Sequence, residues 1–87
     1  MKQEVIDRLH ELEARRSALQ AELEDFAMMM GIKRDDLIVE VKAMGWHSGS
    51  QVLRLLSMPQ EVMDAMQQVM NRKAQELNEV NKEIDEL

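Results

Sequence analysis

The chain has 87 residues and a formal net charge of −6, and 32% of its residues are charged whereas only 2% are aromatic. This length allows one domain with a small core, and so few aromatic rings argue against a compact globule, which usually buries more ring surface. The acidic excess disfavours an overall attraction to DNA or to acidic membranes, and the absence of Cys excludes disulfides and thiolate metal sites.

Residues 1–30 are predicted to form a long helix, the first arm of a coiled coil. Apolar residues recur at alternating spacings of four and three, and one cation interrupts the run: Val5, Leu9, Leu12, Arg16, Leu19, Leu23, Phe26, Met30. This alternation is the pattern of a coiled-coil seam. We expect the helix to cover residues 3–30 and to end at Gly31 in the left-handed conformation that helix C-termini favour.

Residues 31–56 form a different segment, which we expect to cap one end of the arms with two short helices. The first would cover residues 37–44 and close at Gly45, and the second would cover residues 51–56. Apolar side chains at helical spacing support the first helix. The β-branched side chains of the segment also permit a strand in its place: Ile38, Val39 and Val41.

Residues 57–87 are predicted to form the second arm, a helix that runs to the C-terminus. Ser57 and Gln60 have the spacing of a capping box, with Pro59 in the first turn, where its missing N–H costs little. The seam again alternates spacings of four and three around one cation: Met63, Met66, Met70, Lys73, Leu77, Val80, Ile84, Leu87. The second arm therefore matches the first in period.

Pairing the two seams gives an antiparallel hairpin in which Leu12 faces Val80. In this register Arg16 and Lys73 fall in neighbouring layers, where nearby carboxylates can neutralise them: Glu13, Glu22 and Glu76. The predicted fold class is all-α, a single domain over residues 1–87 with an antiparallel coiled-coil helical hairpin capped at one end by two short helices. Because such a hairpin buries little surface against the entropy of ordering the chain, we expect a homodimer.

The first predicted helix carries a face of small residues away from the seam, formed by Ala14, Ala18 and Ala21. This face is either an exposed helix surface with good helix propensity or a close contact between two copies.

Candidates for catalysis or for metal binding are few, since the chain has two His, no Cys and no Tyr. His10 lies three residues from Asp7 and Glu13, but it falls on the outer face of the predicted helix, and the seam offers no inward carboxylate. We therefore expect no catalytic residues, no metal site, no cofactor and no enzymatic activity.

The predicted partner-binding surface is the capped end, where apolar and basic residues gather. A Trp is either a core residue or an interface anchor, and Met residues either fill a core or line an adaptable binding surface. The candidate partner-binding residues are Trp46, His47, Met44, Arg54, Leu55, Met28 and Met29.

We expect a non-enzymatic protein–protein interaction module, an adaptor, chaperone or regulator that oligomerises through its arms and binds a protein through the capped end. The alternative is a nucleic-acid-associated transcriptional regulator whose phosphate contacts would be Lys33, Arg34 and Lys42, joined by Arg54. The second short helix is too short to serve as the recognition helix of a helix-turn-helix. A third hypothesis is an acidic inhibitor that mimics DNA. No stretch resembles a signal peptide or a membrane span, so a cytoplasmic location is expected.

Overall fold

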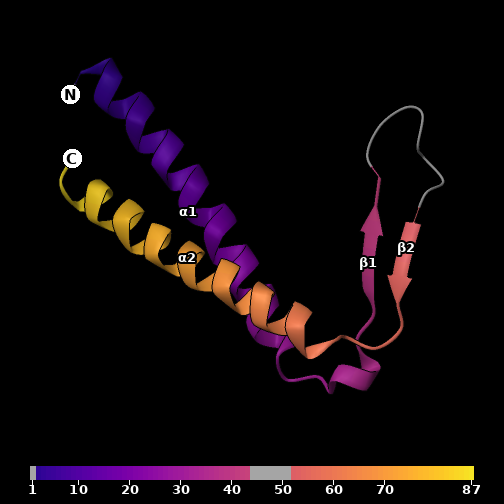
Figure 1. Ribbon diagram of the computed structural model, residues 1–87. Helices are drawn as coiled ribbons and strands as arrows, with labels where there is room; N and C mark the ends of the chain where they lie inside the picture. The colour runs from indigo at the N-terminus through magenta and orange to yellow at the C-terminus, as the bar shows by residue number, and fades with distance from the viewer. Residues whose placement is uncertain (1, 44–51) are drawn as a thin grey trace.

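The computed structural model describes residues 2–43 and 52–87, which form two long helices and a two-stranded hairpin (Figure 1). The elements in chain order are helix α1 (Gln3–Met29), a 3-10 turn η1 (Arg34–Asp36), strand β1 (Val39–Lys42), strand β2 (Val52–Leu55) and helix α2 (Gln60–Asp85). The helices pack antiparallel as one arm, with both chain ends at its far end. The strands leave the other end of the arm and diverge from both helices, which gives the described chain a V shape.

Both predicted arms are confirmed, and their seam is the packed face between α1 and α2. All the seam positions that lie within the two helices are buried or half-buried, whereas Met30 and Leu87 lie beyond the helix ends and are exposed. Leu12, Leu19 and Val80 form the buried centre of the arm, and two partly buried residues pack against it: Leu77 and Ile84. The expected proximity of Leu12 and Val80 is therefore confirmed.

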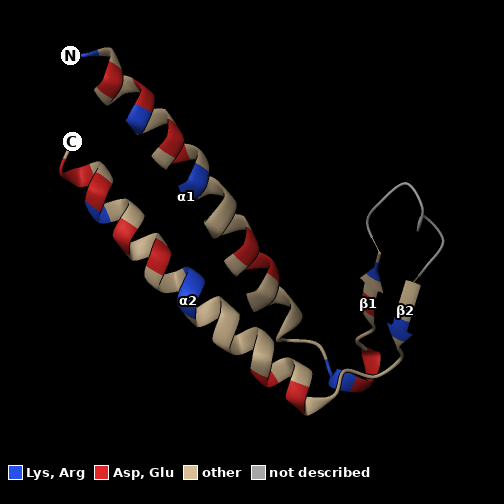
Figure 2. Cartoon of the chain, turned by 45° about the horizontal axis from the view of Figure 1, so that its top comes forward, with Lys and Arg blue, Asp and Glu red and all other residues tan. Residues whose placement is uncertain are grey.

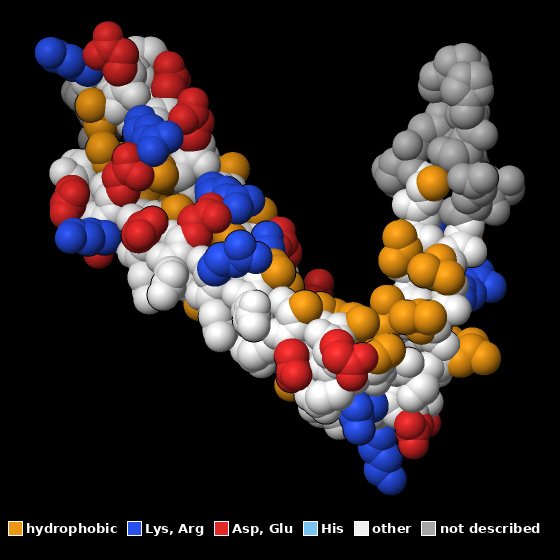
Figure 3. Space-filling model, in the orientation of Figure 1, with side chains coloured by type: hydrophobic (Ala, Val, Ile, Leu, Met, Phe, Trp, Pro, Cys, Tyr) orange, Lys and Arg blue, Asp and Glu red, His pale blue; other side chains and the backbone are white. Residues whose placement is uncertain are grey.

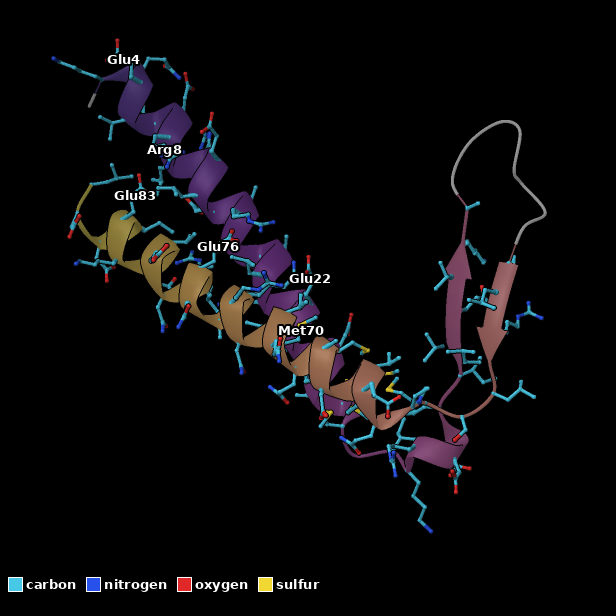
Figure 4. The ribbon with its side chains drawn as sticks, viewed as in Figure 1. Glu4, Arg8, Glu22, Met70, Glu76 and Glu83 are labelled. Atoms are coloured by element: carbon cyan, nitrogen blue, oxygen red, sulfur yellow. The ribbon has the colours of Figure 1, made fainter. Side chains whose placement is uncertain are left out.

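Charged residues, mostly acidic, lie along both helices of the arm (Figure 2), and ion pairs flank the apolar seam (Figure 4). Arg8 donates to both carboxylate oxygens of Glu83, with Nη2 2.8 Å from Oε1 and 3.0 Å from Oε2. Lys73 in the seam pairs with Glu22, as expected for a cation that must be neutralised in a mostly apolar layer. These cross-helix pairs agree with the register that the seam predicts.

A third cross-helix ion pair, between Arg15 and Glu76, contributes to the stability of the arm in a pH-dependent way. Arg15 Nη2 lies 2.9 Å from Glu76 Oε1, and hydrogen bonding to Arg15 lowers the pKa of Glu76 from its ordinary value of 4.5. Because the folded pKa lies below the unfolded one, this stabilisation is present above pH 4.5 and is lost as the pH falls through the folded pKa.

We therefore expect Glu76→Gln to lower the thermal midpoint at neutral pH by a small amount, and the difference from the unmodified chain to shrink as the pH falls below 4.5. Thermal unfolding followed by circular dichroism over a pH series measures this, with the exposed Glu79→Gln on the same helix as control. A difference that grows on acidification would contradict the assignment.

The predicted start of the second helix is wrong. The hydroxyl of Ser57 donates to Asp35 Oδ1 at 3.1 Å, and Pro59, not Ser57, is the N-cap of α2. A residue that precedes proline is disfavoured in the α region, so the helix cannot begin at Met58 and starts after the proline instead. The Pro59 carbonyl accepts the first helical bonds, from Val62 and Met63 at 3.1 Å each.

The end of α1 is confirmed to within a residue, but the predicted conformation of Gly31 is wrong. Gly31 does not adopt a positive φ. The helix instead closes through short turns, in which the Gly31 N–H bonds the Met28 carbonyl at 3.2 Å and the Ile32 N–H bonds the Met29 carbonyl at 3.0 Å. These bonds satisfy the terminal carbonyls without a left-handed residue.

The prediction of two short helices in the middle segment is also wrong, because two strands form there. The molecule is therefore mostly α rather than all-α. Residues of the expected helix 37–44 form β1, and residues of the expected helix 51–56 form β2. The strands pair antiparallel with Val39 opposite Leu55 and Lys42 opposite Val52. The strand that the β-branched residues permitted is thus the observed structure, since their side chains pack well on a pleated surface.

A second small core, here called the elbow cluster, joins the hairpin to the arm. It consists of the buried residues Leu37, Met58 and Met63, against which three partly buried residues pack: Val39, Val62 and Met66. The Met58 N–H also donates to the Arg34 carbonyl at 3.2 Å, which ties the two chain segments that enter and leave the hairpin. The elbow cluster is therefore what holds the hairpin against the end of the arm.

Candidate protein-binding surface

Large hydrophobic side chains are exposed at one end of the described molecule, at the elbow and along the hairpin (Figure 3). Leu87, at the far end of the arm, is the exception among the described residues. The remaining exposed hydrophobic residues are here called the elbow surface: Met28, Met29, Met30, Ile32, Ile38, Val41, Val52, Leu53 and Leu56. Patches of this kind on soluble proteins mark sites of interaction.

One part of the elbow surface lies at the C-terminal end of α1. An open hollow of about 400 Å³ is lined there by Asp25, Met28, Met29 and Ile32. Met28 is 75% exposed, and the thioether side chain of Met adapts its shape to different neighbours. The hollow is thus apolar with a single carboxylate at its border, a suitable receptor for an apolar side chain of another protein.

The other part lies on the hairpin, whose two faces differ in chemistry. Because side chains alternate along a strand, four aliphatic residues share one face: Val39, Val41, Leu53 and Leu55. The opposite face carries Glu40, Lys42, Val52 and Arg54. Val39 and Leu55, near the elbow cluster, are half-buried, whereas Val41 is 57% exposed and Leu53 is 59% exposed. The outer half of the aliphatic face is therefore uncovered.

Charges on the opposite face of the hairpin neutralise one another. Arg54 Nε donates to Glu40 Oε2 at 3.0 Å, and Lys42 Nζ lies 3.1 Å from Glu40 Oε1. These hydrogen bonds, first from Arg54 and then from Lys42, lower the pKa of Glu40 from its ordinary value of 4.5. The three charged side chains of this face are consequently suited to water rather than to an apolar contact, and Val52 is the apolar residue beside them.

The structure brings together only some of the predicted partner-binding residues. Met28 and Met29 line the hollow, and Leu55 lies at the base of the aliphatic face, but Arg54 points from the opposite face of the same strand. The remaining predictions lie outside the described residues: Met44, Trp46 and His47. Val41 and Leu53 were not predicted as binding residues. They were expected on two separate short helices, which would not have placed them on one shared face.

The predicted phosphate contacts are not gathered on one surface. Lys33 and Arg34 lie at the start of η1, next to Asp35 and Asp36, whereas Lys42 lies on the hairpin beside Glu40. Each group of cations therefore has carboxylates as neighbours.

Within residues 2–43 and 52–87, no three His, Asp or Glu side chains are grouped as a metal site would require. Over the same residues, neither helix has both the length and the apolar character needed to cross a bilayer. Comparisons with protein families, with curated proteins and with solved structures gave no match.

Proposed function

We propose that the chain is a non-enzymatic protein-interaction module, a small adaptor or regulator that binds a protein through its elbow surface. The observation that supports this proposal most is the concentration of exposed large hydrophobic side chains at one end of the described molecule. Exposure of that much apolar surface is unfavourable in water unless another molecule covers it. The ion-paired arm, in contrast, has the polar exterior of a surface that stays in water.

The arm is proposed to hold and present the elbow surface. Its seam is filled within one chain by Leu12, Leu19 and Val80, so the helices have no need of a second chain to pair. This shifts the proposed interaction from the arms to the elbow. There the hollow beside Met28 would receive an apolar side chain of the bound protein, and the aliphatic face of the hairpin would extend the contact.

The pairing of both hairpin cations with Glu40 weighs against the alternative of a nucleic-acid-associated regulator. Phosphate binding would have to compete with Glu40 for Lys42 and Arg54.

The decisive substitution is Met28→Glu, which places a carboxylate in the hollow beside Asp25. We expect it to reduce capture of partner proteins from an extract of the source cells at least about tenfold, because a charge in an apolar contact is poorly tolerated. The immobilised full chain and quantitative mass spectrometry of the bound proteins measure this effect.

Leu87→Glu is the matched control, because Leu87 is exposed and apolar but lies at the other end of the arm. Capture that survives Met28→Glu unchanged, or that Leu87→Glu reduces equally, would contradict binding at the elbow surface. Both variants should keep the helical signal of the unmodified chain, since neither position is buried.

A further inference from the structure

We propose that three methionines at the C-terminal end of α1 are an oxidation site, where a peroxide converts each thioether to a sulfoxide and thereby weakens protein binding at the hollow. These residues, here called the methionine site, are consecutive in the chain: Met28, Met29 and Met30. The oxidation itself is independent of the proposed function, whereas its effect on binding rests on that function. The substrate class is a small hydroperoxide, with hydrogen peroxide as the simplest member.

Exposure to solvent separates the methionine site from the other described methionines. The exposed fraction is 75% for Met28, 37% for Met29 and 44% for Met30, so a small oxidant can reach all three side chains. The remaining described methionines are buried or half-buried: Met58, Met63, Met66 and Met70. Because the chain has no Cys, no thiol of its own competes with these thioethers for the oxidant.

The chemical step is a two-electron oxidation at each sulfur. A lone pair of the thioether sulfur attacks one oxygen of hydrogen peroxide, an S–O bond forms and the O–O bond breaks. The second oxygen leaves as water and takes both hydrogens of the peroxide, so sulfur is oxidised and the peroxide is reduced. The product is a sulfoxide, a polar side chain in place of a flexible apolar one.

The hollow offers a sulfoxide oxygen no hydrogen-bond donor that could replace water. Its lining consists of a carboxylate, two thioethers and an aliphatic side chain: Asp25, Met28, Met29 and Ile32. Carboxylates and thioethers accept hydrogen bonds but do not donate them, and an aliphatic group does neither. The backbone N–H groups of residues 30–32 are already used, since they donate to carbonyls in the turns that close α1. A sulfoxide in the hollow therefore depends on water for its hydrogen bonds.

Binding of an apolar side chain in the hollow removes that water. A sulfoxide oxygen that loses water and gains no donor is left unsatisfied, and burial of an unsatisfied polar group is unfavourable. Oxidation is known to disrupt contacts that depend on methionine for this reason, and enzymatic reduction reverses it. Oxidation of the methionine site should thus lower affinity reversibly, without any change in the packed seam or in the elbow cluster.

The site itself is tested by treating the full chain with hydrogen peroxide and following each methionine by peptide mass spectrometry. Rates are taken while the helical circular dichroism signal is intact. We expect sulfoxide to form at Met28 at least about fivefold faster than at Met58, since Met58 is buried in the elbow cluster. Equal rates at these two positions would overturn the assignment of the site.

The effect on binding is measured as capture of partner proteins from the cell extract, with each peroxide-treated chain compared with its own untreated sample. We expect treatment to reduce capture by the unmodified chain at least about tenfold. A chain with Met28→Leu, Met29→Leu and Met30→Leu should lose little of its own untreated capture, because Leu has a similar volume and no sulfur. Met70→Leu is the control, a change of a half-buried methionine on α2 that should leave the sensitivity to peroxide unaltered.

Reduction of the oxidised unmodified chain provides a second readout that needs no variant. Methionine sulfoxide reductases with a dithiol remove the oxygen as water while the dithiol becomes a disulfide, and capture should return. Capture that survives oxidation of all three methionines, equal loss in the triple Leu variant, or no recovery on reduction would overturn the inference. The proposed function fails separately, when Met28→Glu leaves capture unchanged. Capture that is lost in Met28→Glu but kept after oxidation would retain the proposed function and exclude control by peroxide.

Discussion

Leu19→Ala is expected to lower the free energy of unfolding by about 3–5 kcal/mol, close to the upper end of the range for such substitutions. Leu19 is the one fully buried large side chain among the described residues, at 0% exposure, and it lies in the central cluster of the arm with Leu12 and Val80. Its loss leaves a cavity between two helices whose backbones are held apart by the neighbouring layers, so the site can collapse only in part.

The effect is large against the stability of the whole chain, because a domain of this length is stable by only about 4–13 kcal/mol. Urea unfolding followed by the helical circular dichroism signal measures it, and Leu56→Ala provides the same chemical change at a position that is 76% exposed. A loss below about 1 kcal/mol for Leu19→Ala would show that packing in the seam between α1 and α2 contributes little to the free energy of unfolding.

Leu37→Ala is expected to lower the local stability of the hairpin by about 2–4 kcal/mol and to leave the far half of the arm protected. Leu37 is 4% exposed and belongs to the elbow cluster with Met58 and Met63. Because the strands diverge from both helices beyond Val39, this cluster is the main apolar connection between the hairpin and the arm. Weakening it should free the strands before the helices.

Amide hydrogen exchange resolves this difference, since it reports local opening element by element. The expected result is faster exchange in β1 and β2 than in the unmodified chain, with unchanged exchange near Leu12 in α1. Ile38→Ala is the control, because Ile38 is the next residue and is 56% exposed. Equal loss of protection throughout both helices would mean that the elbow and the arm unfold as one unit.

The arms were predictable from sequence because their pattern is long and local. The seam of α1 repeats over about seven turns, and each turn supports the same period. The bounds of both helices therefore came out close to the observed ones, and the register placed Leu12 near Val80. The caps were less predictable: Pro59 displaced the expected start of α2, and short turns closed α1 without a left-handed Gly31.

The hairpin could not be predicted in the same way, because its decisive contacts are distant in sequence. Apolar residues between 37 and 44 fit one face of a helix, but a run this short fits a strand equally well. Pairing with β2 decides between them: Glu40 meets Arg54, fourteen residues away, and Val41 meets Leu53. No local pattern contains that information.

The residues of the candidate site were likewise predictable where they depend on local sequence and unpredictable where they depend on the pairing of distant segments. Met28 and Met29 were predicted as partner-binding residues because apolar residues gather at that end of the arms, and they line the hollow. Leu55 and Arg54 were both assigned to the capped end, where apolar and basic residues gather, yet alternation along a strand places them on opposite faces. The aliphatic face became visible only when both strands were placed side by side.

The two ends of the chain lie next to each other at the tip of the arm, opposite the elbow (Figure 1). With 27 residues in α1, a rise of 1.5 Å per residue puts about 40 Å between that tip and the elbow. Adjacent ends of this kind allow a chain to be inserted into a surface loop of a host protein without stretching either one. The chain could therefore be inserted into a host protein so that the arm acts as a helical spacer and holds the elbow surface away from the host.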